Sequence, residues 1–153
     1  MLRLPHFRLD SQPSFGEEIQ TEYFVSREHA PAALNAVRGL ASQIQPHLIV
    51  SELRTAAADD LWLSGAYGQD VLAIHFTWYD HRDEVYGLLP AIEAALAPFG
   101  VRPHWGKAHR FDAASISRVH PRLADARAVF ERLDPEGRFS NAHLERVGLR
   151  DPR

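Results

Sequence analysis

The most regular pattern in the chain is a nine-residue alternation at 71–79, VLAIHFTWY. Residues two apart in a β-strand point to the same face, so one face of this segment carries only large apolar side chains, among them Phe76. The opposite face carries His75 and Thr77. We predict a central strand whose apolar face packs against helices while the other face stays open.

Three further segments have the composition of strands. IQTEYFV (19–25) is β-branched and aromatic, HLIVSELRT (47–55) begins as an apolar strand, and VRPHWGK (101–107) is a short extended segment. Residues 55–70 contain two glycines and the pair Asp59 and Asp60, so we expect a solvated connection there.

Helical spacing of apolar residues appears in two places between these strands. It runs from about Ser26 to Ile44, and again over the residues that follow Asp80 and end at Gly100. We expect Asp80 to cap the second helix, and Pro90 to kink it or split it in two.

The order strand, helix, strand, strand, helix, strand is that of the split βαβ, or ferredoxin-like, arrangement. It predicts an α+β fold in which one antiparallel sheet carries its helices on a single face. A third main helix is expected from Pro121 to Leu133, followed by a turn at 134–141 and a C-terminal tail, whereas residues 1–18 read as irregular. We expect residues 1–153 to form one domain.

The open face of the predicted sheet is unusually polar. Glu52 and Arg54 lie two apart on one face of strand 47–55, and they share the open side with His75 and Thr77 if the apolar faces agree. Lys107, at the end of the fourth segment, can join them. A solvated face with a surface ion pair is the alternative, and the residues alone leave it open. One acid, two bases, an imidazole and a hydroxyl also suit a hydroxyl-rich ligand.

Composition excludes several classes of function. The apolar fraction of 45%, the charged fraction of 24% and the net charge of −3 describe a globular protein without the basic patch that nucleic-acid binding needs. The absence of cysteine excludes disulfides and cysteine-based metal sites. No apolar run is long enough to cross a bilayer, and the start of the chain does not resemble a signal peptide, so a cytoplasmic protein without membrane contact is expected.

Metal and hydrolase chemistry have little support. His104 and His109 are five apart and lack the context of a zinc-binding helix, so no metal site is predicted. Ser64 and Ser140 have no catalytic triad around them.

Four motifs give the chain a specific resemblance. SELRT, HFTW, RPHWGK and DPEGRFSNAHLERV, in this order and spacing, resemble the C-terminal part of alditol oxidases, and the opening RLPHFRLDSQPSFGEEIQTEYFV also fits. These are flavoenzymes of the vanillyl-alcohol oxidase superfamily, related to the sugar-lactone oxidases. The resemblance implies oxidation of a primary alcohol of a polyol such as xylitol or sorbitol, with hydride transfer to FAD and reoxidation by oxygen.

The resemblance also assigns roles to residues. It implies that Glu52, Arg54, His75, Thr77 and Lys107 bind the polyol against the flavin, and that Lys107, Glu52 and His75 take part in catalysis. His75 would be the acceptor of the hydroxyl proton. Asn141 and His143 resemble the terminal segment near the flavin, although Asn141 alone is equally well read as a turn residue.

The family's flavin-binding domain is expected to be absent from these residues. The chain is therefore interpreted as a cap-type, substrate-binding domain for a polyol or sugar lactone, inactive by itself and completed by a separate flavin-binding domain. The alternatives are a stand-alone ligand-binding module and a self-associating remnant. Because the open face would be bare, a homodimer is expected.

Overall fold

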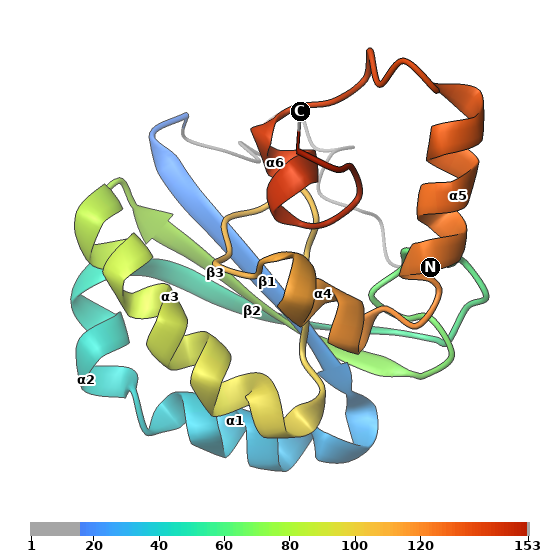
Figure 1. Cartoon of the computed structure of the whole chain (residues 1–153). Coiled ribbons are helices and arrows are strands. Elements are labelled where there is room, and N and C mark those ends of the chain that lie inside the picture. Colours follow the sequence, from blue (N-terminus) through green and yellow to red (C-terminus); the bar gives the residue numbers. More distant parts are fainter. Residues whose placement is uncertain (1–15, 153) are drawn as a thin grey trace, which may run out of the picture.

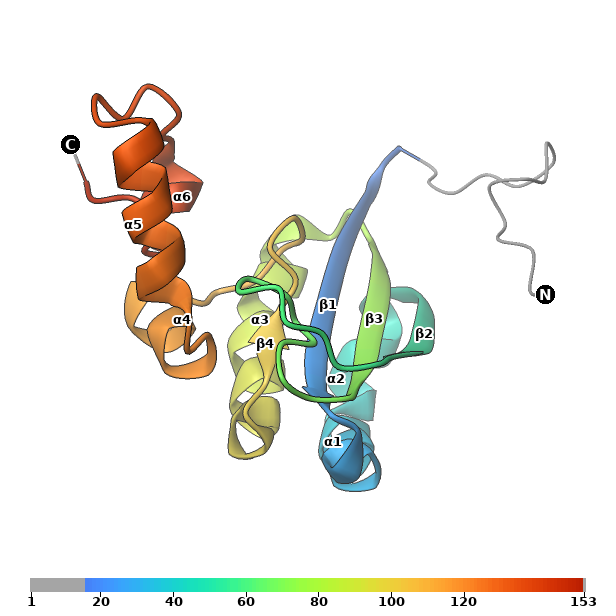
Figure 2. The same cartoon turned by 90° about the vertical axis from the view of Figure 1, so that its right-hand side faces the viewer.

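The computed structural model describes residues 16–152, so most of the segment 1–18 that we expected to be irregular lies outside the described residues. Its centre is a four-stranded antiparallel sheet with the order β2-β3-β1-β4 (Figure 1, with β4 labelled in Figure 2). The strands are β1 (Glu18–Ser26), β2 (Leu48–Ala56), β3 (Val71–Tyr79) and β4 (Arg102–Pro103). This order confirms the ferredoxin-like prediction.

Three helices cover one face of the sheet (Figure 1). These are α1 (Ala30–Arg38), α2 (Ala41–Ile44) and α3 (Arg82–Leu96). The first expected helix is interrupted at Gly39 and Leu40, and short 3-10 turns extend several helix ends. Gly100 ends the α3 region as predicted, with a left-handed φ of 64°.

The structure contradicts two details expected for α3, the cap at Asp80 and the split at Pro90. Asp80 does not cap the helix: the N-cap position is His81, and the Asp80 carboxylate accepts a hydrogen bond from Arg82 instead. Pro90 does not split the helix, which runs unbroken from Arg82 to Leu96. The buried residues Leu89 and Ile92 on either side of Pro90 pack into the same core, and this packing offsets the hydrogen bond that proline cannot make.

The core lies between the sheet and these helices. The apolar face of β3 contributes four side chains, and Trp78 is fully buried among them while its indole N–H donates to the Thr21 hydroxyl at 3.0 Å. From α3, the buried residues are Val85, Leu88, Leu89, Ile92 and Leu96. The prediction that Phe76 faces the helices and His75 faces away is confirmed.

The C-terminal quarter of the chain stands to one side of the sheet (Figure 2). It contains α4 (Ala113–Val119), α5 (Leu123–Leu133) and α6 (Ala142–Arg146). α5 is the third helix expected from the sequence, beginning two residues later than predicted. α4 was not expected, although Asp112 and Ser115 form a reciprocal capping box at its start. Among residues 16–152, no helix has the length and apolar character needed to cross a membrane.

The second face of the sheet is only half open. The segment 57–70 crosses in front of β1 and β4 (Figure 2). It lies so close to the sheet that a Cβ on Gly65 would meet the Phe24 ring at 2.5 Å. Within the segment, the Asp59 carboxylate accepts hydrogen bonds from Ser64 and from the Leu61 N–H, so it organises the turn. The uncovered half carries the polar side chains that the sequence singled out.

Candidate functional site

The polar half of the face is built from a row of residues on three adjacent strands. The strand register places Glu22 of β1 opposite His75 of β3, and His75 opposite Glu52 of β2. Cross-strand partners point to the same face and lie within reach of each other. Arg54 follows on β2, and Lys107 arrives from the segment after β4. The sheet therefore brings all five predicted ligand-binding side chains, including Thr77, to one place.

Glu22 lies at the centre of this cluster and is almost completely buried, with 7% of its side chain exposed. Its Oε2 accepts a hydrogen bond from Lys107 Nζ at 2.6 Å, and its Oε1 accepts one from Arg54 Nη1 at 3.0 Å. Each carboxylate oxygen thus holds one cation. Charge-assisted hydrogen bonds of this kind are the strong ones in proteins.

The surroundings of Glu22 keep it ionised. Burial alone would raise the pKa of this carboxyl, but its charged and hydrogen-bonding neighbours outweigh burial and hold the pKa at about 2. His75 Nδ1 lies 3.6 Å from Glu22 Oε2, which is too long for a direct hydrogen bond, so we attribute the lowering to the two cations.

Lys107, His75 and Thr77 form a chain of hydrogen bonds. Lys107 Nζ lies 2.8 Å from His75 Nδ1, and His75 Nε2 lies 3.0 Å from Thr77 Oγ1. An ammonium can only donate, so Nδ1 accepts and the ring proton of a neutral His75 sits on Nε2. Both ring nitrogens of the buried imidazole therefore have partners, which leaves His75 poorly placed to accept a substrate proton.

The outer wall of the cluster is exposed. Arg54 bridges two carboxylates, since its Nη2 also donates to Glu52 Oε2 at 2.5 Å. Both Arg54 and Glu52 keep 48% of their side chains exposed, whereas Lys107 keeps 17%. The two carboxylates and the two cations balance in charge. A site of this kind favours a neutral ligand with several hydroxyl groups over a charged one.

Lys107 is distinctive in composition as well as in position. It is the only lysine in the sequence, against sixteen arginines. Lysine offers a compact ammonium with three donors, which a planar guanidinium does not match. Glu22 and His75 take up two of those donors, so one N–H remains to face a ligand.

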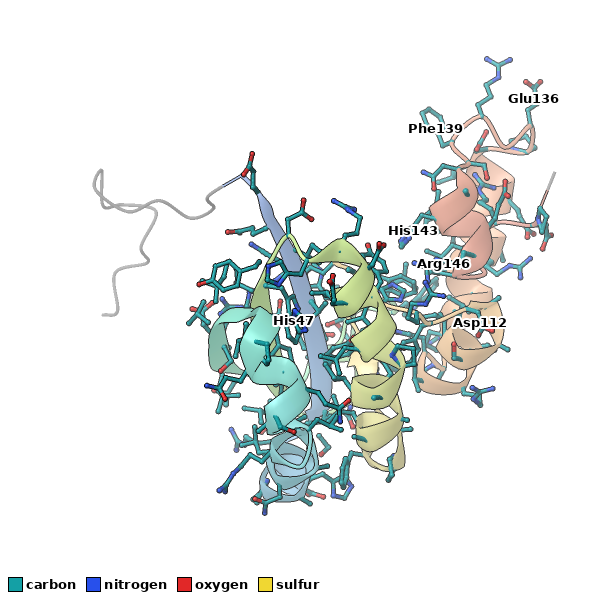
Figure 3. All side chains as sticks on the ribbon, turned by 90° about the vertical axis from the view of Figure 1, so that its left-hand side faces the viewer. His47, Asp112, Glu136, Phe139, His143 and Arg146 are labelled. Atoms are coloured by element: carbon teal, nitrogen blue, oxygen red, sulfur yellow. The ribbon has the colours of Figure 1, made fainter. Side chains whose placement is uncertain are left out.

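A pocket of about 590 Å³ adjoins Lys107. Its walls are the segment 105–110, Tyr86 of α3, and His143 and Arg146 of α6. Figure 3 shows His143 and Arg146 close together on α6, on the side toward α3. Among the described residues, no Asp or Glu side chain lines this pocket, so its walls are cationic.

Asn141 and His143, the two residues assigned to the flavin by resemblance, occupy different positions. His143 lines the pocket, and its Nδ1 lies 3.2 Å from Arg146 Nη2. Asn141 is the N-cap of α6, where its side chain accepts a hydrogen bond from the Leu144 N–H at 3.0 Å. Residues 16–152 contain no group of three or more His, Cys, Asp or Glu side chains that could hold a metal ion.

The sequence profile of the D-arabinono-1,4-lactone oxidase family matches residues 11–147. The chain belongs to this family. It is 44% identical to an alditol oxidase from Streptomyces sp. over 142 residues, and this alignment covers 93% of the chain and 34% of the relative. It is 35% identical over 129 residues to an L-gulono-1,4-lactone dehydrogenase from Mycobacterium tuberculosis, covering 84% of the chain and 30% of the relative.

A more distant relative in the oxidase family is the L-gulonolactone oxidase of Bos taurus, 28% identical over 139 residues, covering 87% of the chain and 31% of the relative. The chain spans about a third of the length of the curated relatives that it matches. Membership of the lactone oxidase family therefore holds for the chain, while the activity of a whole family member is a separate matter.

Sequence reasoning found five members of the polar cluster and missed the sixth, Glu22. The signal was present in IQTEYFV, where Gln20 and Glu22 alternate with Ile19 and Tyr23 and therefore share the face of Phe24. What the pattern lacked was the register, because the pairing of Glu22 with His75 depends on which strands are neighbours. In this member of the lactone oxidase family, the least exposed acid of the site thus lies on the first strand.

Proposed function

We propose that this chain is the substrate-binding part of an FAD-dependent oxidase that acts on a polyol of the xylitol or sorbitol type, with a sugar lactone as the alternative substrate. The observation that carries the proposal is one charge-balanced cluster, in which the buried carboxylate of Glu22 holds Lys107 and Arg54 while His75, Thr77 and Glu52 contact these two cations or each other. A neutral molecule rich in hydroxyls can satisfy every donor and acceptor that such a face presents.

Each residue has a distinct part in holding the substrate. The remaining N–H of Lys107 donates to the hydroxyl that is oxidised, and Arg54 donates to a neighbouring hydroxyl. Glu52, exposed and acceptor-only, accepts a hydrogen bond from a further hydroxyl. The hydroxyl oxygen of Thr77 accepts a hydrogen bond from His75 Nε2–H. The hydroxyl proton of Thr77 is therefore free to be donated to a substrate oxygen. Lys107 also stabilises the negative charge that grows on the reacting oxygen as its proton passes to solvent water at the exposed side of the cluster.

The pocket beside Lys107 fits the isoalloxazine part of FAD in its chemistry. When bound, FAD would accept the hydride and later pass the electrons to oxygen. Lys107, His143 and Arg146 would hold this group, and the positive charges of Lys107 and Arg146 would stabilise the negative charge that it gains on reduction. Asn141 would act on this wall indirectly, by capping the helix that carries His143 and Arg146.

A fusion protein tests this function. The chain joined to the FAD-binding part of an alditol oxidase relative should consume oxygen with xylitol or sorbitol, whereas the chain alone should not. In the fusion, Lys107→Met removes a contact that strengthens as the alkoxide forms, and turnover should fall roughly 100- to 1000-fold. Arg38→Met, an exposed change on α1, is the matched control and should leave turnover unaltered.

Two results would contradict the proposal. The first is an active fusion in which Lys107→Met and Glu52→Gln each change turnover by less than about threefold. This result would show that the polar face is not the substrate site. A fusion that binds polyols tightly without oxidising them would favour the alternative, a ligand-binding module that lacks oxidase chemistry.

A further inference from the structure

We propose that Glu22 is the positioning residue of the polyol site: it aims the ammonium of Lys107 at the ligand, fixes the tautomer of His75 and sets the site's preference for neutral ligands. The inference rests on the proposed function for the identity of the ligand. Its effect on Lys107 and His75 concerns this chain alone and can be measured without any ligand.

The burial of Glu22 separates it from the ligand-contacting residues. Its side chain is 7% exposed, on a strand with neighbours on both sides, whereas Arg54 and Glu52 are nearly half exposed. Glu22 acts on the ligand through the two cations that it holds. The 2.6 Å contact with Lys107 joins residues 85 positions apart in the chain, so it also ties the segment after β4 to the centre of the sheet.

The carboxylate determines which protons the site presents. Glu22 and His75 Nδ1 take two of the three Lys107 donors, so the third has a fixed direction. Because Nδ1 accepts from Lys107, the His75 proton sits on Nε2 and points at Thr77. Without the negative charge on Glu22, nothing in this chain of contacts would hold the ammonium against the imidazole.

Two substitutions separate charge from shape. Glu22→Gln keeps the size of the side chain but replaces one acceptor oxygen with an NH₂ group. This group can only donate, so it cannot accept the hydrogen bond of Lys107 or of Arg54. It also leaves the cluster with a net charge of about +1, because two cations then balance only Glu52. Glu22→Asp keeps the charge but is one methylene shorter, so it cannot hold both cations at the distances seen here. Glu18→Gln, on the same strand and face, is the matched control.

The first measurement uses the only lysine of the chain. In ¹⁵N spectra tuned to ammonium groups, the wild-type chain should show one lysine signal protected from exchange, and Glu22→Gln should lose it while Glu18→Gln keeps it. In the wild-type chain, the imidazole ¹⁵N shifts of His75 should show a protonated Nε2 and an unprotonated Nδ1. A protonated Nδ1 in the wild type would overturn the proposal even if Glu22→Gln did not fold.

The second measurement is calorimetric binding of xylitol and of its carboxylic acid analogue, xylonate. Glu22→Gln should weaken xylitol binding roughly ten- to a hundredfold, the usual size of a lost charge-assisted hydrogen bond. Because the variant site is positively charged, the ratio of xylonate to xylitol affinity should rise about tenfold or more. A residue that merely stabilised the fold would weaken both ligands alike.

The outcomes distinguish the two proposals. If Glu22→Gln retains the lysine signal and binds xylitol within about threefold of the wild type, the role assigned to Glu22 is wrong. If the wild-type chain binds neither ligand, the proposed function is wrong, and the lysine and histidine spectra alone decide whether Glu22 positions these residues.

Discussion

The two halves of the second sheet face each bury a charged side chain, and they do so in opposite ways. In the half that is covered by the segment 57–70, Arg102 is 9% exposed and donates to backbone oxygens: Nε to Val119 at 2.8 Å, and Nη1 to Gly65 at 3.1 Å and Tyr67 at 2.9 Å. In the uncovered half, Glu22 accepts from the side chains of Lys107 and Arg54.

The hydrogen-bond partners of the two buried charges explain why one half of the face is closed and the other can hold a ligand. Backbone carbonyls are fixed by the chain, so Arg102 locks the segment 57–70 and the end of α4 onto the sheet. Trp105 adds to this closure, because its indole N–H donates to the Leu63 carbonyl at 2.6 Å. Side-chain partners, by contrast, keep donors of their own. A buried charge held by side chains can therefore pass its influence on to a ligand, whereas one held by backbone serves to close the surface.

The largest expected effect is on the closed half. Arg102→Met leaves three backbone oxygens without the guanidinium that serves them, and we expect the free energy of unfolding to fall by about 3–5 kcal/mol. Urea denaturation measures this loss, with Arg38→Met as the exposed control. A loss below about 1 kcal/mol would mean that Arg102 does not hold the segment 57–70 in place.

A second effect of the closed half depends on pH. His120 is buried against the ring of Trp105, with ring centroids 4.7 Å apart. Burial, aided by the nearby Arg102, lowers the pKa of His120 from 6.5 to about 4. The unfolded chain therefore binds more protons in this interval, and stability should fall as the pH drops from about 6.5 to about 4. Between about pH 8 and about pH 5 this one group accounts for roughly 2 kcal/mol.

The control for that loss is His120→Phe, which removes the titrating group but keeps an aromatic ring. Its stability should decline less steeply over the same interval in urea titrations at several pH values. His109, with a pKa lowered to about 3 mainly by burial, adds its own share of the loss in both proteins. Glu22 acts at lower pH, because its stabilisation is lost only as the pH falls from 4.5 toward about 2. Identical pH slopes for the two proteins would contradict the assignment to His120.

The smallest expected change in stability belongs to the open half. Glu52→Gln breaks an exposed ion pair with Arg54, and we expect the free energy of unfolding to change by less than about 1 kcal/mol. The same substitution should weaken polyol binding, because Glu52 faces the ligand. Thermal unfolding and calorimetry on one sample compare the two quantities. A large loss of stability with unchanged polyol binding would show that Glu52 holds the fold together and does not contact the ligand.

Local pattern was enough to predict the elements that form the sheet. The alternation at 71–79 gave the bounds of β3 without error, because each face of that strand has its own chemistry. α4 was missed although Asp112 and Ser115 form its capping box, since the helix is short and only Ile116 in it is buried. The unbroken α3 shows that tertiary packing can override the local preference of Pro90.

The site was predictable where it followed from alternation and unpredictable where it followed from pairing between distant segments. Glu52, Arg54, His75 and Thr77 share a face by spacing alone. The central place of Glu22 requires the register of β1 against β3, which no local rule supplies. Nor did the sequence indicate that 57–70 would close half of the face, because its attachment depends on Arg102, more than thirty residues further along the chain.

The position of β2 at the edge of the sheet gives a bound ligand a mechanical role. Among the described residues this strand is paired with β3 alone, and most of its length is exposed. Such a strand is the part of a sheet that opens most readily. A polyol that touches Arg54 at one end and Lys107 at the other would join β2 to the segment after β4, across two intervening strands. The bound ligand would stabilise β2 against local opening, so the amide hydrogens of β2 would exchange more slowly while the ligand is bound.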